Sequence, residues 1–545
     1  MYCTGSLLST IQLSGIFNDS KTFVDMPMKQ DYSPEDVLES FQYLNNKEDP
    51  DVLTQFVVDH FDSAGSDVKE WIPEDYTESP SLLASIRNLE YVSWAKDINA
   101  LWLSLGRQLD ESVIARPEQH SLLVRKHPFI VPGGRFRETY YWDSWFIMKG
   151  LLACDMTTTS KYLILNLLED VNNYGFVPNG ARIYYLDRSQ PPVLSEMVME
   201  YYEHCTKTIM QSEEKDELIQ FVRSSYTSLK MEYAFWMEEK ENGHVTTVST
   251  SSGNFKLNRY SSTAASPRPE SYREDYTTAA HANSSNVYTN IRAGAESGWD
   301  FSSRWIRRTI PGDKEGEDVY DLAHIQTTEI VPVDLNSILY RFEGNLKHLA
   351  GILHHSYPDQ QFEQDVMKFS ELQEKRAQAM RAVLWDSETS CYKDFNITSH
   401  SYSDIVTASS YFPMWAGLIA REDTENSLLS LQKSNLLQKA GVLTTTVHNS
   451  FQQWDAPNAW APIVMIIIMG LRTLDTEPSR ALAHEIKQQW LQTGYMAYQR
   501  DGYMYEKYDA YVVGKGGGGG EYEPQIGFGW TNGVVLALLR EEEPV

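Results

Sequence analysis

Residues 79–106, SPSLLASIRNLEYVSWAKDINALWLSLG, carry the pattern that decides the fold class. Ser79 is a suitable helix cap, and the proline that follows it suits the first turn of a helix. Apolar side chains then recur at helical spacing, and Gly106 is placed to end the helix. These side chains are Leu82, Ile86, Leu89, Ile98, Leu101, Trp102 and Leu105. The stretch therefore predicts one amphipathic helix from about residue 79 to residue 105.

The same helical period recurs along most of the chain. A second clear stripe runs through Ile338, Phe342, Leu346, Leu349 and Leu353. Strand-like alternation is rare, and GHVTTVST at 243–250 is its best example. Further helical stripes lie near 160–173, 193–205, 215–238, 360–384, 405–419, 457–473, 479–493 and 531–541. The coarse prediction is an all-α protein with ten or more helices.

The composition excludes several classes of partner. The chain has 545 residues, 42% of them hydrophobic, and a formal net charge of −28. Nucleic acids and anionic membrane surfaces attract basic patches, so neither is expected as a partner. The longest apolar run, APIVMIIIMGL at 461–471, is too short to span a bilayer and predicts a buried helix, and no signal peptide is recognisable.

Cysteine and histidine spacing gives no support for a metal site. The four cysteines, Cys3, Cys154, Cys205 and Cys391, show no CxxC spacing, and His354 and His355 are merely adjacent on a helical stripe. We expect the cysteines to be small buried side chains, with at most one disulfide. The sequons at Asn18, Asn283 and Asn396 would carry glycans if the chain is secreted.

Between the helices lie loops in which aromatic residues, arginines and carboxylates occur together. Sugars present apolar C–H faces that pack on aromatic rings, and hydroxyl groups that need paired donors and acceptors. The loops are RFRETYYWDSWF, VPNGARIYYLDRSQPP, SPRPESYRED, ESGWDFSSRW and QQWDAPNAW. Any one of them alone could be surface ion pairs and core aromatics, but five together favour a sugar-binding site.

Two longer segments are also interpreted as functional loops. Residues 249–330 have weak periodicity, and their arginines, carboxylates and tryptophans are unlike a disordered linker. KGGGGGEYEPQIGFGW at 515–530 leads directly into a predicted final helix. We expect it to be a mobile loop over the site.

Cleavage of a glycosidic bond typically needs two carboxylates, one that protonates the leaving oxygen and one that activates water or attacks. The residue pattern alone does not rank the available carboxylates. An acid beside Trp299 in GWDF would have an apolar flank that raises its pKa. The candidates are Glu138, Asp143, Glu270, Asp300, Asp455, Glu506 and Glu521.

Several of these motifs resemble those of the trehalase family. PGGRFRETYYWDSW at 132–145 resembles the first family signature, with Trp145 where a tyrosine is usual, and QWDAPNAWAP at 453–462 resembles the second throughout. GGGGEY, SGWDFSSRW and EKYD are also similar to family motifs, and the resemblance extends from about residue 1 to about residue 541. It implies a single catalytic domain over 1–545, an (α/α)6 barrel with its active-site loops at one mouth. An N-terminal extension of about residues 1–75 is expected to pack on the barrel.

The resemblance also implies a reaction and the residues that carry it. The reaction is hydrolysis of α,α-trehalose to two glucoses with inversion, with Asp300 as general acid and Glu506 as general base and with no cofactor or metal. Glu521 would reach the sugar when the Gly-rich loop closes, and Trp145 would affect only fine positioning of the substrate. The residues assigned to the sugar are Arg135, Phe136, Trp142, Asp143, Asn179, Arg188, Gln190, Arg268, Glu270, Gly298 and Glu521.

Two alternatives to this function remain open at the level of sequence. One is a catalytically inactive sugar-binding homologue, and the other is an inverting α-glucosidase of the same barrel type that acts on a different sugar. The presence of both Asp300 and Glu506 argues against the first, and the two signatures argue against the second. YCTGSLLSTIQLSGIFNDSKTFVDMP at 2–27 resembles the start of mature animal trehalases, so secretion is expected, while membrane anchoring and oligomeric state stay open.

Overall fold

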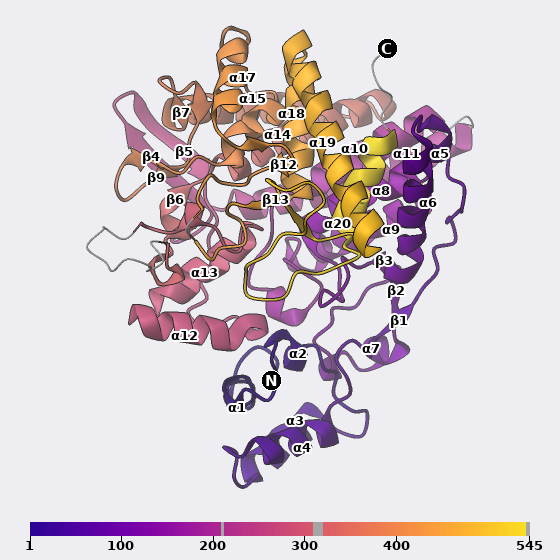
Figure 1. Ribbon diagram of the computed structural model, residues 1–545, viewed down its shortest axis with the longest axis vertical. Coiled ribbons are helices and arrows are strands. Elements are labelled where there is room, and N and C mark those ends of the chain that lie inside the picture. The colour runs from indigo at the N-terminus through magenta and orange to yellow at the C-terminus, as the bar shows by residue number, and fades with distance from the viewer. Residues whose placement is uncertain (209–211, 309–319, 449, 541–545) are drawn as a thin grey trace.

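The computed structural model consists mainly of helices, with a smaller N-terminal group of helices below the main helical body (Figure 1). It describes residues 1–208, 212–308, 320–448 and 450–540. Within these residues, six helices form an inner ring in which each helix contacts the next and the last contacts the first. They are α8 (Tyr141–Ala153), α10 (Leu194–Thr208), α14 (Val333–Ser356), α16 (Phe412–Ala416), α18 (Ala461–Leu474) and α20 (Gly529–Arg540).

The helices that alternate with these in the sequence pack outside them, which makes the fold an (α/α)6 barrel. The inner helix α18 is apolar on nearly every face, as expected of a helix surrounded by protein. Outer helices such as α15 bury only one face. The outer helices are α6 (Leu89–Leu105), α9 (Thr157–Tyr174), α11 (Ser212–Trp236), α15 (Gln360–Val383), α17 (Thr424–Lys433) and α19 (Glu477–Asp501). The all-α prediction and the implied barrel are therefore confirmed.

The ring closes where α8 and α20 approach each other unusually closely. A Cβ atom on Gly533 of α20 would lie 2.1 Å from the carbonyl oxygen of Phe146 on α8. A Cβ atom on Gly150 of α8 would lie 2.4 Å from the Cα atom of Gly533. Only glycine allows this approach, so this pair of residues brings the last inner helix against the first.

Short strands tie the loops together at the ends of the helices. β4 (Val245–Thr250) lies in the stretch 243–250 whose alternation indicates a strand, and it pairs with β5 (Gly253–Asn258) as a hairpin. β13 (Asn458–Trp460) pairs antiparallel with β14 (Lys507–Asp509), which places the second signature beside Glu506. The other strands are β1 (Val68–Glu70), β2 (Gly106–Leu109), β3 (Phe129–Ile130), β6 (Ile330–Val331), β7 (Trp385–Asp386), β8 (Cys391–Tyr392), β9 (Phe395–Asn396), β10 (Ser401–Tyr402), β11 (Leu437–Gln438) and β12 (Gly441–Val442).

The helix predicted from residue 79 is wrong at its N-terminal end. A short helix, α5 (Leu82–Ser85), stops at Ile86, and α6 begins only at Leu89. Asn88 is the true cap, because its side-chain oxygen accepts a hydrogen bond from the N–H of Glu90 at 2.9 Å. The stripe near 405–419 was also over-extended, since it yields only α16 after a 3₁₀ turn, and Gly417 ends that helix at a φ of 75°.

Residues 249–330 are not the long structureless loop that their composition predicts. They contain β5, α12 (Tyr272–Ala282), α13 (Asn286–Glu296) and several 3₁₀ turns, while residues 309–319 lie outside the described residues. α13 buries Arg292 and Glu296 as well as apolar side chains. Buried polar side chains interrupt the apolar stripe, and this is why the helical period was not visible.

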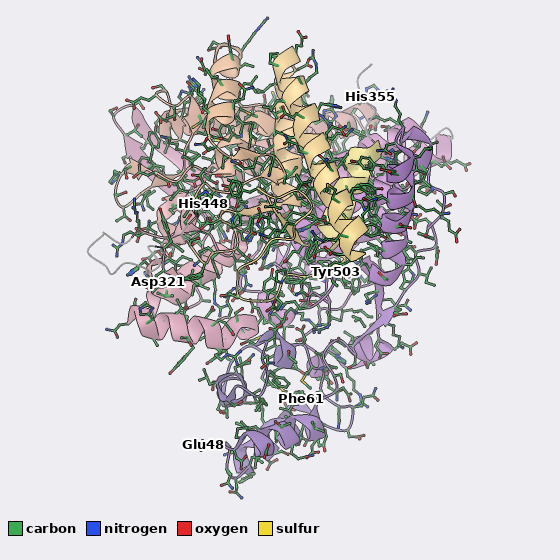
Figure 2. The ribbon with its side chains drawn as sticks, viewed as in Figure 1. Glu48, Phe61, Asp321, His355, His448 and Tyr503 are labelled. Carbon is green, nitrogen blue, oxygen red and sulfur yellow. The ribbon has the colours of Figure 1, made fainter. Side chains whose placement is uncertain are left out.

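The N-terminal segment, residues 1–65, forms a lobe below the barrel, where Figure 2 labels Phe61. It has a small apolar core of its own, to which Tyr140, Tyr184 and Tyr185 of the barrel loops contribute. Its helices are α1 (Ser6–Ser14), α2 (Lys21–Val24), α3 (Pro34–Tyr43) and α4 (Pro50–His60), and α7 (Glu111–Ala115) follows β2. Treating residues 1–75 as an extension of one catalytic domain stays a prediction.

Three of the cysteines and the apolar run at residues 461–471 are buried, as expected from the sequence. Cys154, Cys205 and Cys391 are buried, Cys3 is half-buried, and all four are free, so the one disulfide left open by the sequence is absent. Residues 461–471 lie in the buried helix α18. No described helix is long and apolar enough to cross a membrane. The described residues also contain no group of three His, Cys, Asp or Glu side chains that could hold a metal ion.

Candidate active site

A narrow cavity of about 80 Å³ lies where the loops that enter the inner helices converge. Every residue that the family resemblance assigns to catalysis or to the sugar lines it: Arg135, Phe136, Trp142, Asp143, Asn179, Arg188, Gln190, Arg268, Glu270, Gly298, Asp300, Glu506 and Glu521. Segments up to several hundred residues apart in the sequence are thus brought to one site.

The structure separates the carboxylates that the sequence could not rank. Glu138 is absent from the cavity wall and makes buried ion pairs with Lys21 at 2.7 Å and Arg182 at 3.1 Å. Asp455 is also absent from the wall and accepts hydrogen bonds from hydroxyl groups, including that of Ser302 at 2.8 Å. Both side chains hold loops in place, and the five other candidates face the cavity.

The first signature forms a tight turn followed by the start of α8. Gly133 and Gly134 have φ angles of 113° and 63°, which glycine adopts readily, so the backbone can turn tightly at this point. The turn carries Arg135 and Phe136, and Trp142 and Asp143 follow in the first turn of α8.

The Trp145 departure from the family pattern falls outside this site. The Trp145 side chain is fully buried on α8 and lies 5.6 Å from the ring of Trp415 on α16, measured between centroids. It is not part of the cavity wall. Trp145 therefore does not contact the cavity, which gives no direct support to the expected effect on substrate positioning. Its side chain instead packs between two inner helices, α8 and α16.

Two arginines of the wall are held by carboxylates. Arg188 donates to the side-chain oxygen of Asn179 at 2.8 Å and to Glu270 at 2.6 Å. Arg268 donates to Asp275 at 2.7 Å and to Glu521 at 3.2 Å. Charge-assisted bonds of this kind fix the guanidinium planes.

Glu270 stays ionised in this arrangement. Burial raises the pKa of its carboxyl, but the guanidinium groups of Arg188 and Arg268 outweigh burial, and the net pKa lies below its ordinary value. Beside it, the side-chain oxygen of Gln190 accepts a hydrogen bond from the N–H of Trp142 at 3.1 Å. The wall therefore offers fixed cations, anions and amides to a polyhydroxylated ligand.

Asp300 lies two residues after Gly298, which packs so closely against the aromatic wall that a side chain would not fit there. Gly298 has a φ of 75°, and a Cβ atom there would lie 2.9 Å from the Trp142 ring. The backbone oxygen of Asp300 accepts a hydrogen bond from Gln453 at 2.7 Å, which holds the loop. No described arginine or lysine lies within ion-pair distance of the Asp300 carboxyl.

The Asp300 carboxyl is poised to hold a proton. Burial raises its pKa to about 7, the charge of Arg268 offsets part of this effect, and Glu521 adds to it. The direction agrees with the prediction made from the neighbouring Trp299, which is fully buried and stacks on Trp454 at a centroid distance of 5.5 Å.

Glu506 is also buried but has closer hydrogen-bonding and cationic neighbours than Asp300. One carboxylate oxygen, Oε1, accepts a hydrogen bond from the hydroxyl of Tyr522 at 2.8 Å, and the Lys507 ammonium lies 3.8 Å from Oε2. Burial raises the pKa of Glu506, while Lys507 and the Tyr522 hydroxyl counteract part of that rise. Oε2 is buried and accepts no hydrogen bond from any residue in the described part of the chain.

Asp143 is, after Asp300, the second carboxylate of the wall without a cationic partner among the described residues. Burial raises its pKa well above the ordinary value, and the charges of Glu506 and Asp300 raise it further. Mutual repulsion of this kind indicates that the three carboxyl groups share one small region. Burial and the neighbouring charges therefore favour the neutral form of Asp143.

The sequence-based site omitted most of the aromatic wall. Trp454 and Trp460 stack in parallel at a centroid distance of 4.1 Å. Their signal was already present in QWDAPNAW, but an aromatic residue in a motif does not show whether it faces a site or a core. The omitted wall residues are Tyr140, Tyr185, Ser271, Ala295, Trp454, Trp460, Tyr522, Phe528 and Trp530.

Comparison with known proteins places these features in a family. The trehalase family model matches residues 15–542. A trehalase from Apis mellifera is 38% identical over 99% of this chain and 83% of its own length, and a trehalase from Oryctolagus cuniculus is 38% identical over 99% of this chain and 89% of its own length. Among solved structures, the neutral trehalase Nth1 from Saccharomyces cerevisiae has a TM-score of 0.59 at 23% identity, covering 76% of this chain and 73% of that one. The last likeness bears on the fold alone.

Proposed function

The chain belongs to the trehalase family, and on that premise we propose that it hydrolyses α,α-trehalose with inversion at one anomeric carbon. As a glycoside hydrolase it acts on the bond between two glucose units. The observation that carries the proposal is the unequal pair of carboxyl groups in one cavity, Asp300 with a raised pKa and Glu506 with one oxygen free of hydrogen bonds.

The two groups then have complementary roles. The protonated Asp300 donates its proton to the glycosidic oxygen as the bond from that oxygen to the anomeric carbon breaks. Oε2 of the ionised Glu506 takes a proton from a water molecule, whose oxygen bonds to the anomeric carbon from the opposite face. One glucose leaves with a new hydroxyl from the protonated oxygen, and the other carries the hydroxyl of the water.

The remaining wall residues bind and orient the sugar rings. The arginine–carboxylate pairs present fixed donors and acceptors to hydroxyl groups. The tryptophan rings offer flat apolar surfaces to C–H faces and exclude water from the reacting bond. Asp143, kept neutral by burial, can donate as well as accept a hydrogen bond.

The test is a comparison of trehalose with maltose, followed by proton NMR of the first products. Inversion at one anomeric carbon of α,α-trehalose releases one β-glucose and one α-glucose, so equal amounts of both anomers should appear before mutarotation. Release of α-glucose alone would contradict inversion. Equal or faster turnover of maltose would favour a different α-glucosidase, and binding of trehalose without turnover would favour an inactive sugar-binding homologue.

We also propose that the chain is secreted and carries glycans at Asn18 and Asn283. Both asparagines are exposed, and Asn396 is half-buried with its side-chain oxygen bonded to the N–H groups of Thr398 and Ser399. Expression through a secretory pathway, followed by enzymatic removal of N-glycans, should lower the mass of the protein. Substitution of Asn18 and Asn283 by Gln should abolish that change in mass, and an unchanged mass in the unsubstituted protein would contradict the proposal.

A further inference from the structure

Tyr522 contacts the residue assigned as general base. Its hydroxyl donates a hydrogen bond to Oε1 of Glu506 at 2.8 Å, and its ring lines the cavity. A hydrogen bond from a neutral donor to a carboxylate stabilises the ionised form. It also occupies Oε1, so that Oε2 is the oxygen of Glu506 without a hydrogen bond from the described residues.

The Tyr522 ring is itself held between two side chains of the first signature. The guanidinium carbon of Arg135 lies 4.7 Å from the ring centroid, and the Phe136 ring meets it edge-on at 5.4 Å. The backbone N–H of Arg135 also donates to the side-chain oxygen of Gln525 at 2.8 Å. These three contacts tie the segment after the Gly-rich loop to the turn before α8.

Arg135 is fixed in turn by the N-terminal segment. Its Nε atom donates to Oδ2 of Asp19 at 2.8 Å, and its Nη2 atom donates to Oδ1 at 2.7 Å. Bidentate pairs of this kind fix both the position and the plane of a guanidinium group. The Asp19 side chain is 38% exposed and that of Arg135 is 15% exposed, so the pair lies at the edge of the cavity. Oδ1 of Asp19 also accepts from the N–H of Lys21 at 2.9 Å, which anchors Asp19 at the start of α2.

We propose that Tyr522 and Asp19 are positioning residues for Glu506. Asp19 orients Arg135, and Arg135 holds the Tyr522 ring in place. The Tyr522 hydroxyl then orients the Glu506 carboxylate and stabilises its ionised form. The N-terminal segment is then part of the catalytic apparatus through one ion pair, although it lies outside the barrel. The inference rests on the proposed role of Glu506 and deepens it.

The other charged groups around Glu506 set the background for a pH test. Burial raises the pKa of Glu506, and Lys507, Tyr522 and Arg135 each lower it. The electrostatic interaction of Glu506 with Asp143 acts in the opposite direction. Substitution of Tyr522 by Phe removes one of the lowering contributions and leaves the others in place.

The experiment measures kcat, KM and the pH dependence of kcat/KM for the full-length variants Y522F and D19N and for the double variant. The acid limb reports protonation of the base, so it should move to higher pH by about one unit in Y522F, a shift typical of one lost hydrogen bond to a charged group. At a pH on that limb the rate should fall about 10-fold with KM within about 2-fold. D19N should shift the limb in the same direction by less, and the double variant should shift it no further than Y522F does, because Asp19 acts through Tyr522.

Two matched controls separate positioning from general damage. Tyr505→Phe removes a tyrosine hydroxyl that is bonded to Asp501 and not to Glu506. Asp423→Asn breaks a partly exposed carboxylate–arginine pair, with 2.7 Å between Arg381 and Asp423, on an element that does not line the cavity. Both controls should keep the wild-type acid limb, and melting temperatures of all variants should be compared.

An unshifted acid limb in Y522F, or additive shifts in the double variant, would overturn the inference. The proposed function fails by a different observation. If Glu506→Gln keeps more than about a tenth of the wild-type rate on trehalose, Glu506 is not the base, whatever Tyr522 does. If Glu506→Gln is inactive while Y522F leaves the limb in place, only the positioning role is wrong.

Discussion

Substitution of Asp300 by Asn tests the general acid most directly. Asn has nearly the same shape but cannot transfer a proton to the glycosidic oxygen. With a pKa of about 7, roughly nine in ten Asp300 side chains are protonated at pH 6, whereas at the ordinary aspartate pKa of 3.8 fewer than about one in a hundred would be. The environment of Asp300 thus enriches its acid form about 100-fold at that pH. Positioned acids typically contribute about 10²–10⁴-fold to the rate, so we expect D300N to lose at least about 100-fold on trehalose.

The leaving group distinguishes loss of the acid from general damage to the site. Fluoride leaves a sugar without being protonated, so α-glucosyl fluoride bypasses the general acid. We expect D300N to lose less than about 10-fold on α-glucosyl fluoride while it loses at least about 100-fold on trehalose. Glu506→Gln serves as the control, because it removes the activation of water and should impair both substrates alike.

Asp143 provides the sharpest alternative to this assignment. It also has a raised pKa and no described cationic partner, so it could in principle hold the transferred proton. Asp143→Asn should therefore be measured on both substrates beside D300N. Equal losses of D300N on trehalose and fluoride, or recovery on fluoride by Asp143→Asn instead of D300N, would refute the assignment of Asp300.

Three further predictions follow from the cavity and the ring. The pH profile of kcat/KM should be bell-shaped, because activity is lost at high pH as Asp300 gives up its proton near pH 7 and at low pH as Glu506 gains one; a flat profile from mildly acidic to alkaline pH would contradict both roles. Amides of residues 514–521 should exchange more slowly with deuterium when a saturating trehalose analogue is bound, since five glycines are costly to order, and unchanged exchange would argue against a closing loop. Gly533→Ala should lower the free energy of unfolding in urea by about 1–3 kcal/mol through overpacking against α8, whereas Gly351→Ala, with open space on a helix, should not destabilise the protein.

The helices of the barrel could be predicted from the sequence wherever the burial of an apolar face is what determines the helix. The stripe from Ile338 to Leu353 lies within α14, and all five of its apolar side chains are buried. The prediction failed where buried positions are polar, as with Arg292 and Glu296 on α13, because such positions erase the apolar period. It also failed at Asn88, where a capping side chain starts a new helix within a continuous stripe.

The site was predictable only as far as motifs identify residues. The family motifs selected Asp300 and Glu506, and both line the cavity. The partners that give those residues their chemistry come from distant segments, such as Tyr522 beside Glu506 and Asp19 beside Arg135. No local pattern reports a contact that only the closed ring creates.

The distribution of arginines explains how one cavity can hold carboxylates with different roles. Glu270 accepts a hydrogen bond from Arg188 and has a lowered pKa, so it stays an anionic acceptor for hydroxyl groups. Asp300 has no ion-pair partner among the described residues and lies in the same buried region, so burial dominates and keeps its proton near neutral pH. Glu506 is intermediate, since a tyrosine hydroxyl and a nearby ammonium offset part of its burial without occupying both of its oxygens. Burial is common to all three carboxyl groups, so in the proposed reaction the position of the cationic or neutral donors decides which group binds the sugar, which one gives a proton and which one takes a proton.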